Sequence, residues 1–125
     1  MLILDTCAII EACKPDPDFS SATSDQMELG TYILSISFAE IACKIKLGKL
    51  LMNISVRDLF NEYKQTTGVQ IVDIGINEWL DSIELQWHDN KDPADRIITA
   101  FAAKKNLPIV TCDQKIKSFY QHVIW

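Results

Sequence analysis

The chain has 125 residues, of which 48% are hydrophobic, and its 17 acidic and 12 basic residues give a formal net charge of −5. This length predicts a single domain over residues 1–125 with a core of its own, and the apolar content excludes a disordered chain. An acidic balance argues against a non-specific binder of polyanions, which normally presents a basic surface. It is compatible with an acidic pocket that holds a cation.

The cysteines and the apolar segments indicate the cellular compartment in which the protein is expected. Cys7, Cys13, Cys43 and Cys112 show no C-x-x-C spacing and have apolar neighbours, so we interpret them as reduced core thiols. No apolar run reaches the length needed to cross a membrane, and Met1 leads directly into an apolar run without the basic segment of a secretory signal. We therefore expect a cytoplasmic protein with no membrane partner.

The first half of the chain alternates short apolar runs with helical patterns. Residues 15–24 are rich in Pro, Ser and Asp and carry no recognisable motif. In chain order we predict a buried strand at 1–4, a short helix at 7–13, a weaker helix at 19–29, a strand at 32–34 and a helix that begins near Ser35 or Ser37 and ends at about Leu47, before Gly48.

The second half continues the alternation of strands and helices. We predict a helix at 56–65 after Ser55, a strand at 69–74, a helix from an Asn77 cap to about 86, a polar loop at 88–91, a helix at 94–105 after Asp92-Pro93, a strand at 108–111, a helix capped by Asp113 to about 119, and an edge strand at 122–125. Strands separated by helices form βαβ units, which require parallel pairing. The fold class is therefore α/β, with a mainly parallel central sheet flanked by helices on both faces.

Four carboxylates lie where predicted strands end or predicted helices begin: Asp5, Glu40, Asp95 and Asp113. In an open parallel sheet, ligands bind outside the carboxyl ends of the strands, and we expect the four side chains to meet there. Glu40 is placed in the first turn of the helix that follows the strand at 32–34.

Each acid also has a simpler structural explanation. Ser37-x-x-Glu40 fits a capping box, and Asp92-x-x-Asp95 fits a weaker one. Asp113 fits a helix cap and Asp5 fits an Asx turn. Capping accounts for each acid separately, but it does not account for their convergence on one edge of the sheet.

Converging carboxylates repel one another unless a cation lies between them. These four side chains offer hard oxygen ligands without a His or Cys cluster, which favours Mg²⁺ or Mn²⁺ over zinc. A cation held in this way activates water and stabilises a pentavalent phosphate. The chemistry that the pattern indicates is phosphodiester hydrolysis.

The motifs around these acids resemble those of a known family. Leu4-Asp5-Thr6, Ser35-x-Ser37-x-x-Glu40-Ile41, Asp92-Pro-Ala-Asp95-Arg96-Ile-Ile-x-Ala100 and Thr111-x-Asp113 resemble the four acidic motifs of the PIN-domain ribonucleases. The likeness is greatest to the small VapC-type toxins of prokaryotic toxin–antitoxin pairs. It spans residues 2 to about 119, with the motifs in the expected order.

The resemblance implies a Mg²⁺-dependent endoribonuclease that acts on RNA, forms a homodimer and is blocked by a cognate antitoxin. By motif position it makes Asp5, Glu40, Asp95 and Asp113 the catalytic and metal-binding residues.

Several neighbouring residues are candidates for supporting roles in that site: Thr6, Asp92, Arg96 and Thr111. Asp92 is more simply the cap of its helix than a ligand. Arg96 either contacts an RNA phosphate or pairs with a neighbouring acid on its own helix. His88, alone in a polar loop, is expected to form hydrogen bonds rather than to act as a base.

Other protein classes fit the sequence less well. A haloacid-dehalogenase-like Mg²⁺-dependent phosphatase also begins with an apolar strand and an Asp, but it needs a second Asp at the position of Cys7. A response-receiver domain needs an acidic pair where Asp5 stands alone. A non-enzymatic PIN-like module that only binds a partner is the remaining alternative, and the complete set of four acids favours the enzyme.

Overall fold

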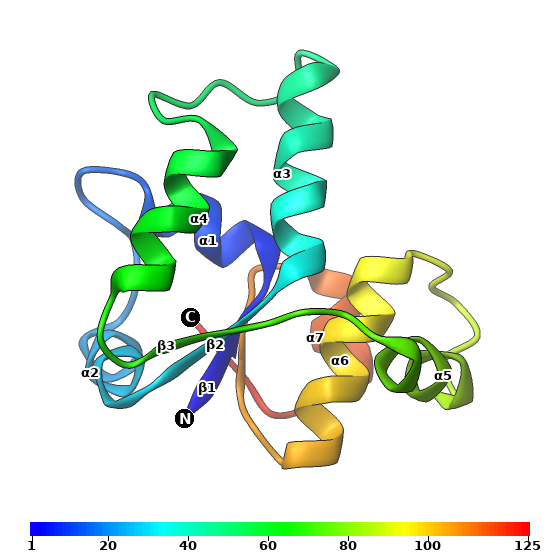
Figure 1. Cartoon of the computed structure of the whole chain (residues 1–125). Coiled ribbons are helices and arrows are strands. Elements are labelled where there is room, and N and C mark those ends of the chain that lie inside the picture. The colour runs from blue at the N-terminus through cyan, green and yellow to red at the C-terminus, as the bar shows by residue number, and fades with distance from the viewer.

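A parallel five-stranded sheet lies at the centre of the computed structural model, which describes all residues from 1 to 125, and its strand order is β3-β2-β1-β4-β5 (Figure 1). The strands are β1 (Leu2–Leu4), β2 (Thr31–Leu34), β3 (Val69–Val72), β4 (Ile109–Val110) and β5 (Val123–Ile124). Every neighbouring pair is parallel. The α/β class and the parallel sheet predicted from the sequence are confirmed.

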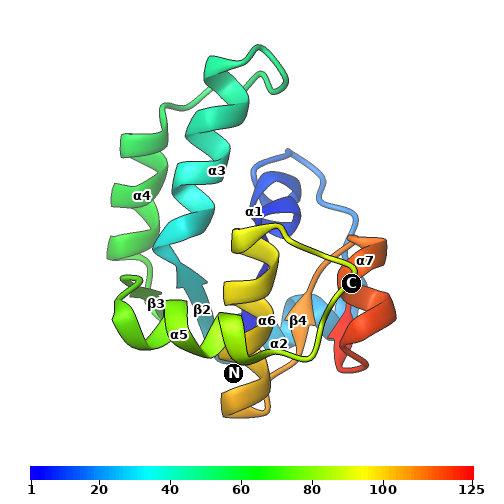
Figure 2. The same ribbon diagram turned by 90° about the vertical axis from the view of Figure 1, so that its right-hand side faces the viewer.

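Seven helices connect the strands and surround the sheet. They are α1 (Thr6–Ala12), α2 (Ser21–Leu29), α3 (Ser35–Lys46), α4 (Val56–Gln65), α5 (Ile76–Glu84), α6 (Pro93–Lys105) and α7 (Gln114–Phe119). Helices α3 and α4 project side by side beyond the carboxyl ends of the strands, and α5 packs along α6 (Figures 1 and 2). None of these helices has the length and apolar character needed to cross a bilayer.

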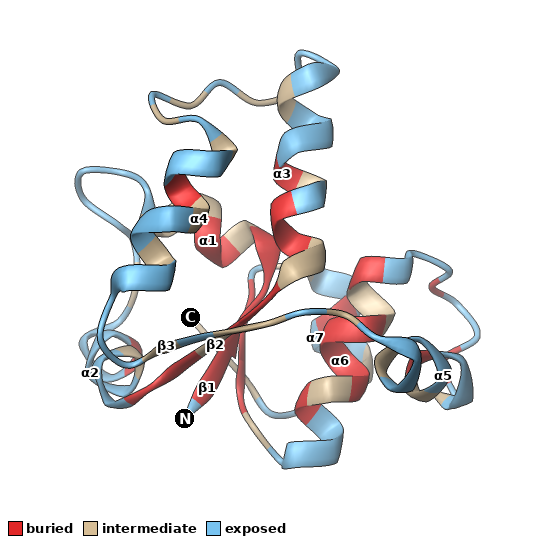
Figure 3. Ribbon diagram, in the orientation of Figure 1, coloured by how far each residue is buried: buried red, intermediate tan, exposed pale blue.

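Side-chain alternation along the strands divides the core into two clusters, one on each face of the sheet. Leu2 and Leu4 of β1 belong to the cluster that contains residues of α1, α3 and α4. Ile3 belongs to the cluster that contains residues of α6 and α7. The central strands β1, β2 and β4 and the inward sides of these helices are largely buried, whereas the edge strands β3 and β5 contain no buried residue (Figure 3). Because both faces of the sheet are covered, both kinds of strand position are apolar, as the sequence predicted.

The start of α3 differs from the prediction. Strand β2 runs directly into α3, Leu34 occupies the N-cap position without a side-chain hydrogen bond, and the helix begins at Ser35. The first turn of α3 therefore contains no acidic residue, and Glu40 lies in the second turn. The proposed capping box between Ser37 and Glu40 does not form. The serine hydroxyls bond to other elements instead: Ser35 Oγ accepts from the backbone N–H of Ile74 (3.0 Å), and Ser37 faces α1.

Helix caps elsewhere agree with the sequence, with one exception. Ser55, Asp92 and Asp113 each accept hydrogen bonds from the first turn of the helix that follows them. The prediction that Asn77 caps α5 is wrong, because the N-cap is Gly75 and Asn77 lies inside the first turn. The backbone is still extended at Gly75, and α5 begins directly after it, so its cap lies two residues before the predicted one.

Candidate active site

Asp5 lies at the carboxyl end of β1 and is the N-cap of α1, with only 3% of its surface exposed. Its Oδ1 accepts a hydrogen bond from the backbone N–H of Thr6 (2.7 Å), and its Oδ2 accepts one from the Thr111 hydroxyl (2.7 Å). Burial raises the pKa of this carboxyl, and the hydrogen bonds from Thr111 and Thr6 oppose that rise. These bonds fix the orientation of the Asp5 carboxylate.

Two threonines link Asp5 to the neighbouring acids. The Thr6 hydroxyl, one residue along α1, donates to Glu40 Oε1 on α3. The Thr111 hydroxyl accepts a hydrogen bond from the backbone N–H of Asp113 (3.0 Å) while it donates to Asp5. Glu40, Asp5 and Asp113 are thus held along one chain of hydrogen bonds that joins α3, β1 and the segment after β4. Both threonines support the acids, as the motif comparison suggested.

The Asp92–Asp95 pair is organised by an asparagine that the sequence reading did not single out. Asp92 Oδ1 accepts from the backbone N–H of Asp95 (3.0 Å), so Asp92 is the helix cap that we predicted. Asn90 is buried, and its Nδ2 donates to Asp95 Oδ2 (2.8 Å) while its Oδ1 accepts from the backbone N–H of Asp92 (2.9 Å). An Asn two residues before a helix cap is a common Asx-turn pattern, and this signal could have identified it.

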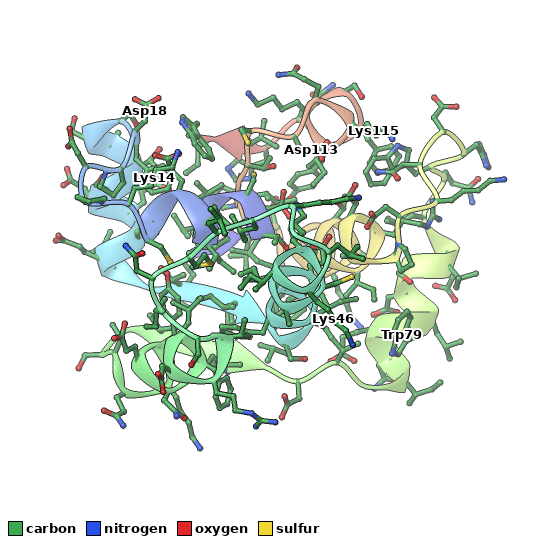
Figure 4. The ribbon with its side chains drawn as sticks, turned by 90° about the horizontal axis from the view of Figure 1, so that it is seen from above. Lys14, Asp18, Lys46, Trp79, Asp113 and Lys115 are labelled. Carbon is green, nitrogen blue, oxygen red and sulfur yellow. The ribbon has the colours of Figure 1, made fainter.

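The four predicted acids lie close enough to influence one another's protonation. Burial is the largest cause of a raised pKa at Asp5, Glu40 and Asp95, and neighbouring charges add to it. Asp113 raises the pKa of Asp5, Asp5 raises that of Glu40, and Asp92, Asp113 and Asp5 all raise that of Asp95, which reaches about 7. The acids therefore meet at the carboxyl edge of the sheet, the side viewed in Figure 4, where Asp113 is labelled.

Three of the four carboxylates keep an oxygen free of protein hydrogen bonds. Glu40 bonds through Oε1, Asp95 through Oδ2 and Asp113 through Oδ1. The second oxygen of each is open to a ligand. All the atoms available as metal ligands are hard carboxylate oxygens, which is the ligand type that Mg²⁺ and Mn²⁺ prefer. In the present conformation, however, no three acidic, His or Cys side chains are in position to hold a metal ion, so closing around a cation would require side-chain rotation.

The cysteines are not core thiols, contrary to our expectation. All four are free, but Cys13, Cys43 and Cys112 are exposed and only Cys7 is partly buried. Cys7 Sγ donates to Asp5 Oδ2 (3.5 Å), so it contributes to the environment of the site rather than to packing alone. Burial, followed by the charge of Asp5, raises the pKa of Cys7 to about 12. Cys7 is therefore a neutral thiol at physiological pH.

Arg96 does not pair with a neighbouring acid, and its contact with an RNA phosphate stays a prediction. Its guanidinium donates to four backbone carbonyls and to no carboxylate: those of Ser82 (3.0 Å), Leu85 (3.1 Å), Trp87 and Asn90 (2.9 Å). It therefore ties the loop between α5 and α6 to the start of α6. Because this loop carries Asn90, Arg96 supports Asp95 indirectly. His88, in the same loop, is exposed.

A family model described as PIN domain matches residues 2–121, and the chain belongs to the PIN domain family. This assignment excludes the haloacid-dehalogenase alternative. Among solved structures, similar chains occur in FitAB bound to an IR36 DNA fragment and in FitAcB from Neisseria gonorrhoeae, both with a TM-score of 0.64 and 19% identity, covering 100% of this chain and 94% and 97% of theirs.

A toxin–antitoxin complex from Klebsiella pneumoniae contains another similar chain, with a TM-score of 0.64, 16% identity and coverage of 100% of this chain and 97% of that one. At these identities the likeness shows a shared fold. No curated protein matches the sequence.

The contacts of Arg96 predict a loss of stability when it is replaced. Arg96→Met leaves four carbonyls without their donor, and we expect the free energy of unfolding to fall by about 2–3 kcal/mol. Urea unfolding measures this. Arg57→Met, at an exposed position on α4, is the matched control and should change stability by less than about 0.5 kcal/mol. Equal effects in the two variants would contradict a structural role for Arg96.

The raised pKa of Asp95 predicts a pH dependence of stability in the absence of metal. A carboxyl whose pKa rises from 3.8 to about 7 on folding favours the folded state most below pH 4, and this advantage disappears as the pH rises to about 7. Asp95→Asn should therefore raise the melting temperature at pH 8 by a few degrees and change it little at pH 4. Thermal unfolding in chelator between these pH values measures the difference. Asp89→Asn, in the neighbouring loop, should leave the pH profile as it is in the wild type.

Proposed function

We propose that this chain is a Mg²⁺- or Mn²⁺-dependent endoribonuclease and the toxin of a toxin–antitoxin pair. One observation carries the proposal: in a chain of the PIN domain family, hydrogen bonds through Thr6 and Thr111 join the acids Glu40, Asp5 and Asp113 at the carboxyl edge of the sheet. Asp95 lies near enough for Asp113 and Asp5 to raise its pKa. Such a cluster is unfavourable for folding alone. A bound divalent cation would offset the repulsion between these acids and would act on a phosphodiester substrate.

The residues of the chain divide the work of the proposed site. Asp5, Glu40, Asp95 and Asp113 would hold the cation, which supplies stabilisation of phosphate charge and an activated water when bound. Thr6 orients Glu40, and Asn90 orients Asp95. Because the pKa of Asp95 is about 7 without a cation, binding of the cation near neutral pH would release a proton from this carboxyl.

The proposed nuclease activity depends on Asp95 and not on Asp92. Asp95→Asn should reduce the rate of RNA cleavage in Mg²⁺ or Mn²⁺ by at least about 100-fold, because it removes a proposed ligand of the cation. Asp92→Ser keeps an oxygen that caps α6 and should retain activity within about threefold of wild type. Cleavage of labelled single-stranded RNA, with the same DNA sequence in parallel, measures both variants.

The same pair of variants tests the toxin role. Expression of the wild type should arrest growth of a bacterial host, and expression of Asp95→Asn should not. A wild-type chain that cleaves neither RNA nor DNA in either metal would instead support the non-enzymatic partner-binding module. Loss of activity in Asp92→Ser with full activity in Asp95→Asn would show that the wrong carboxylate of this motif has been assigned.

Metal binding is expected to stabilise the folded chain. Mn²⁺ at a hundredfold excess over its dissociation constant should add about 2.7 kcal/mol to the free energy of unfolding. Asp5→Asn removes the most rigidly held ligand and should abolish most of this response. Thermal unfolding with increasing Mn²⁺ measures the effect, and Asp25→Asn on the exposed side of α2 is the control. Equal responses in wild type and Asp5→Asn would place the ion elsewhere.

The proposed antitoxin would lie against α3 and α4. Apolar side chains between the two helices, Ile45, Met52 and Ile54, line a hollow, and Leu51 is 95% exposed beside it. Leu59 of α4 is buried and offers no surface to a partner. An apolar antitoxin segment placed here would bring a following Arg to the acids, where its planar fork can bridge two carboxylates.

A second copy of the chain would bind at α5. Ile76, Trp79, Leu80 and Ile83 recur at helical spacing and are 45–73% exposed, so they form an apolar stripe on one side of the helix. Trp79 extends outward from α5 in Figure 4. The stripe is bordered by acids of α5 and lysines of α6, among them Asp81 and Lys104, which form an ion pair. A patch that carries both signs of charge is complementary to itself across a two-fold axis.

The proposed contact through α5 predicts that the wild-type protein has the mass of a dimer in solution. Leu80→Glu places a charge in the middle of the stripe and should convert a dimer into a monomer, which light scattering after gel filtration measures. Leu47→Glu introduces the same charge at another exposed leucine, after α3, and should leave the dimer intact. A dimer that persists in Leu80→Glu, or a monomeric wild type, would contradict the assignment of α5.

A further inference from the structure

Cys7 and Cys112 come together next to the acids. The register of the sheet pairs Leu4 of β1 with Val110 of β4. The backbone N–H of Asp5 continues this pairing by donating to the Val110 carbonyl (3.1 Å). The residues that follow the two strands therefore leave the sheet side by side. Cys7, in the first turn of α1, meets Cys112 in the segment before α7.

The contact between the two cysteines is direct. Cys7 Sγ accepts a hydrogen bond from the backbone N–H of Cys112 (3.2 Å). This bond places the backbone of Cys112 directly against the Cys7 sulfur. A disulfide requires the two Cβ atoms to lie about 3.5–4.5 Å apart. Because Cys112 is exposed, its side chain is free to rotate toward the sulfur that its own backbone already contacts.

We propose that Cys7 and Cys112 are an oxidation site that forms an intramolecular disulfide and thereby alters the acid cluster. The two thiols also differ in access: Cys112 is exposed and Cys7 is partly buried. Cys13 and Cys43 are exposed as well, but neither contacts another cysteine in the structure. Oxidation within one chain is therefore directed to this pair.

The reaction is a thiol–disulfide exchange with a small disulfide as oxidant. The Cys112 thiolate attacks the oxidant, forms a mixed disulfide and releases one small thiolate. Cys7 then loses its proton to water, its thiolate attacks the Cys112 sulfur, and the second small thiolate leaves and takes up a proton. Two protein thiols are oxidised, and one small disulfide is reduced to two thiols.

The new bond acts on the site through Asp5. In the reduced chain the Cys7 thiol donates to Asp5 Oδ2 and lies 3.5 Å from the Thr111 hydroxyl. A disulfide removes this donor and ties α1 to the segment that leads to Asp113. The chain Glu40–Thr6–Asp5–Thr111–Asp113 is then held in a different geometry. The effect on catalysis rests on the proposed nuclease function, whereas formation of the bond does not.

Treatment with glutathione disulfide tests the proposal in two separate measurements. Peptide mapping by mass spectrometry should find Cys7 and Cys112 joined, with the loss of two hydrogen atoms, while Cys13 and Cys43 remain open to alkylation or carry a glutathione. RNA cleavage by the oxidised protein should fall about tenfold, as expected from loss of a hydrogen bond to a charged group, and dithiothreitol should restore it.

Two variants distinguish this bond from general oxidation. Cys112→Ser keeps the backbone N–H that contacts Cys7 but cannot form the bond, so its cleavage rate should not respond to the oxidant. Cys43→Ser, on α3, should respond as the wild type does. Separate Cys7 and Cys112 peptides after oxidation would overturn the proposal. Joined peptides with unchanged RNA cleavage would overturn its regulatory part, and joined peptides in a chain that cleaves no RNA would overturn the proposed function alone.

Discussion

The hydrogen bonds that hold the buried Asp5 carboxylate are the interaction on which the site depends. Asp5 ends the central strand and begins the first helix, so it is fixed by the sheet and by α1 together. Thr6 and Thr111 then extend this fixed point to α3 and to the segment before α7. A functional group placed on rigid elements and held by its neighbours keeps its geometry without relying on flexible loops.

The grouping of these acids opposes the stability of the folded chain. Burial and like charges both raise the pKa values of Asp5, Glu40 and Asp95, so each added negative charge destabilises the folded chain. The two apolar clusters on the faces of the sheet offset this effect. In the proposed metal site this repulsion would favour a compact ligand with at least two positive charges over a monovalent ion.

Much of the fold and part of the site could be predicted from the sequence. Apolar runs and helix caps such as Asp92 and Asp113 gave the order of strands and helices, because these signals are local. The position of Glu40 was misplaced by a turn, since Ser35 and Ser37 resemble caps but bond to distant residues. The roles of Asn90 and Arg96 depend on contacts that form only after α5 and α6 pack together. No local pattern predicts that Cys112 lies against Cys7, because 105 positions separate the two residues in the sequence.

The hydrogen bonds of Arg96 couple the position of α5 to that of the acid Asp95. One guanidinium holds the carbonyls of Ser82 and Leu85 at the end of α5, and also that of Asn90, which positions Asp95. Arg96 of α6 therefore connects the end of α5 to Asn90, and through Asn90 to the Asp95 carboxylate. A displacement of α5 along its axis would pull Asn90 away from Asp95.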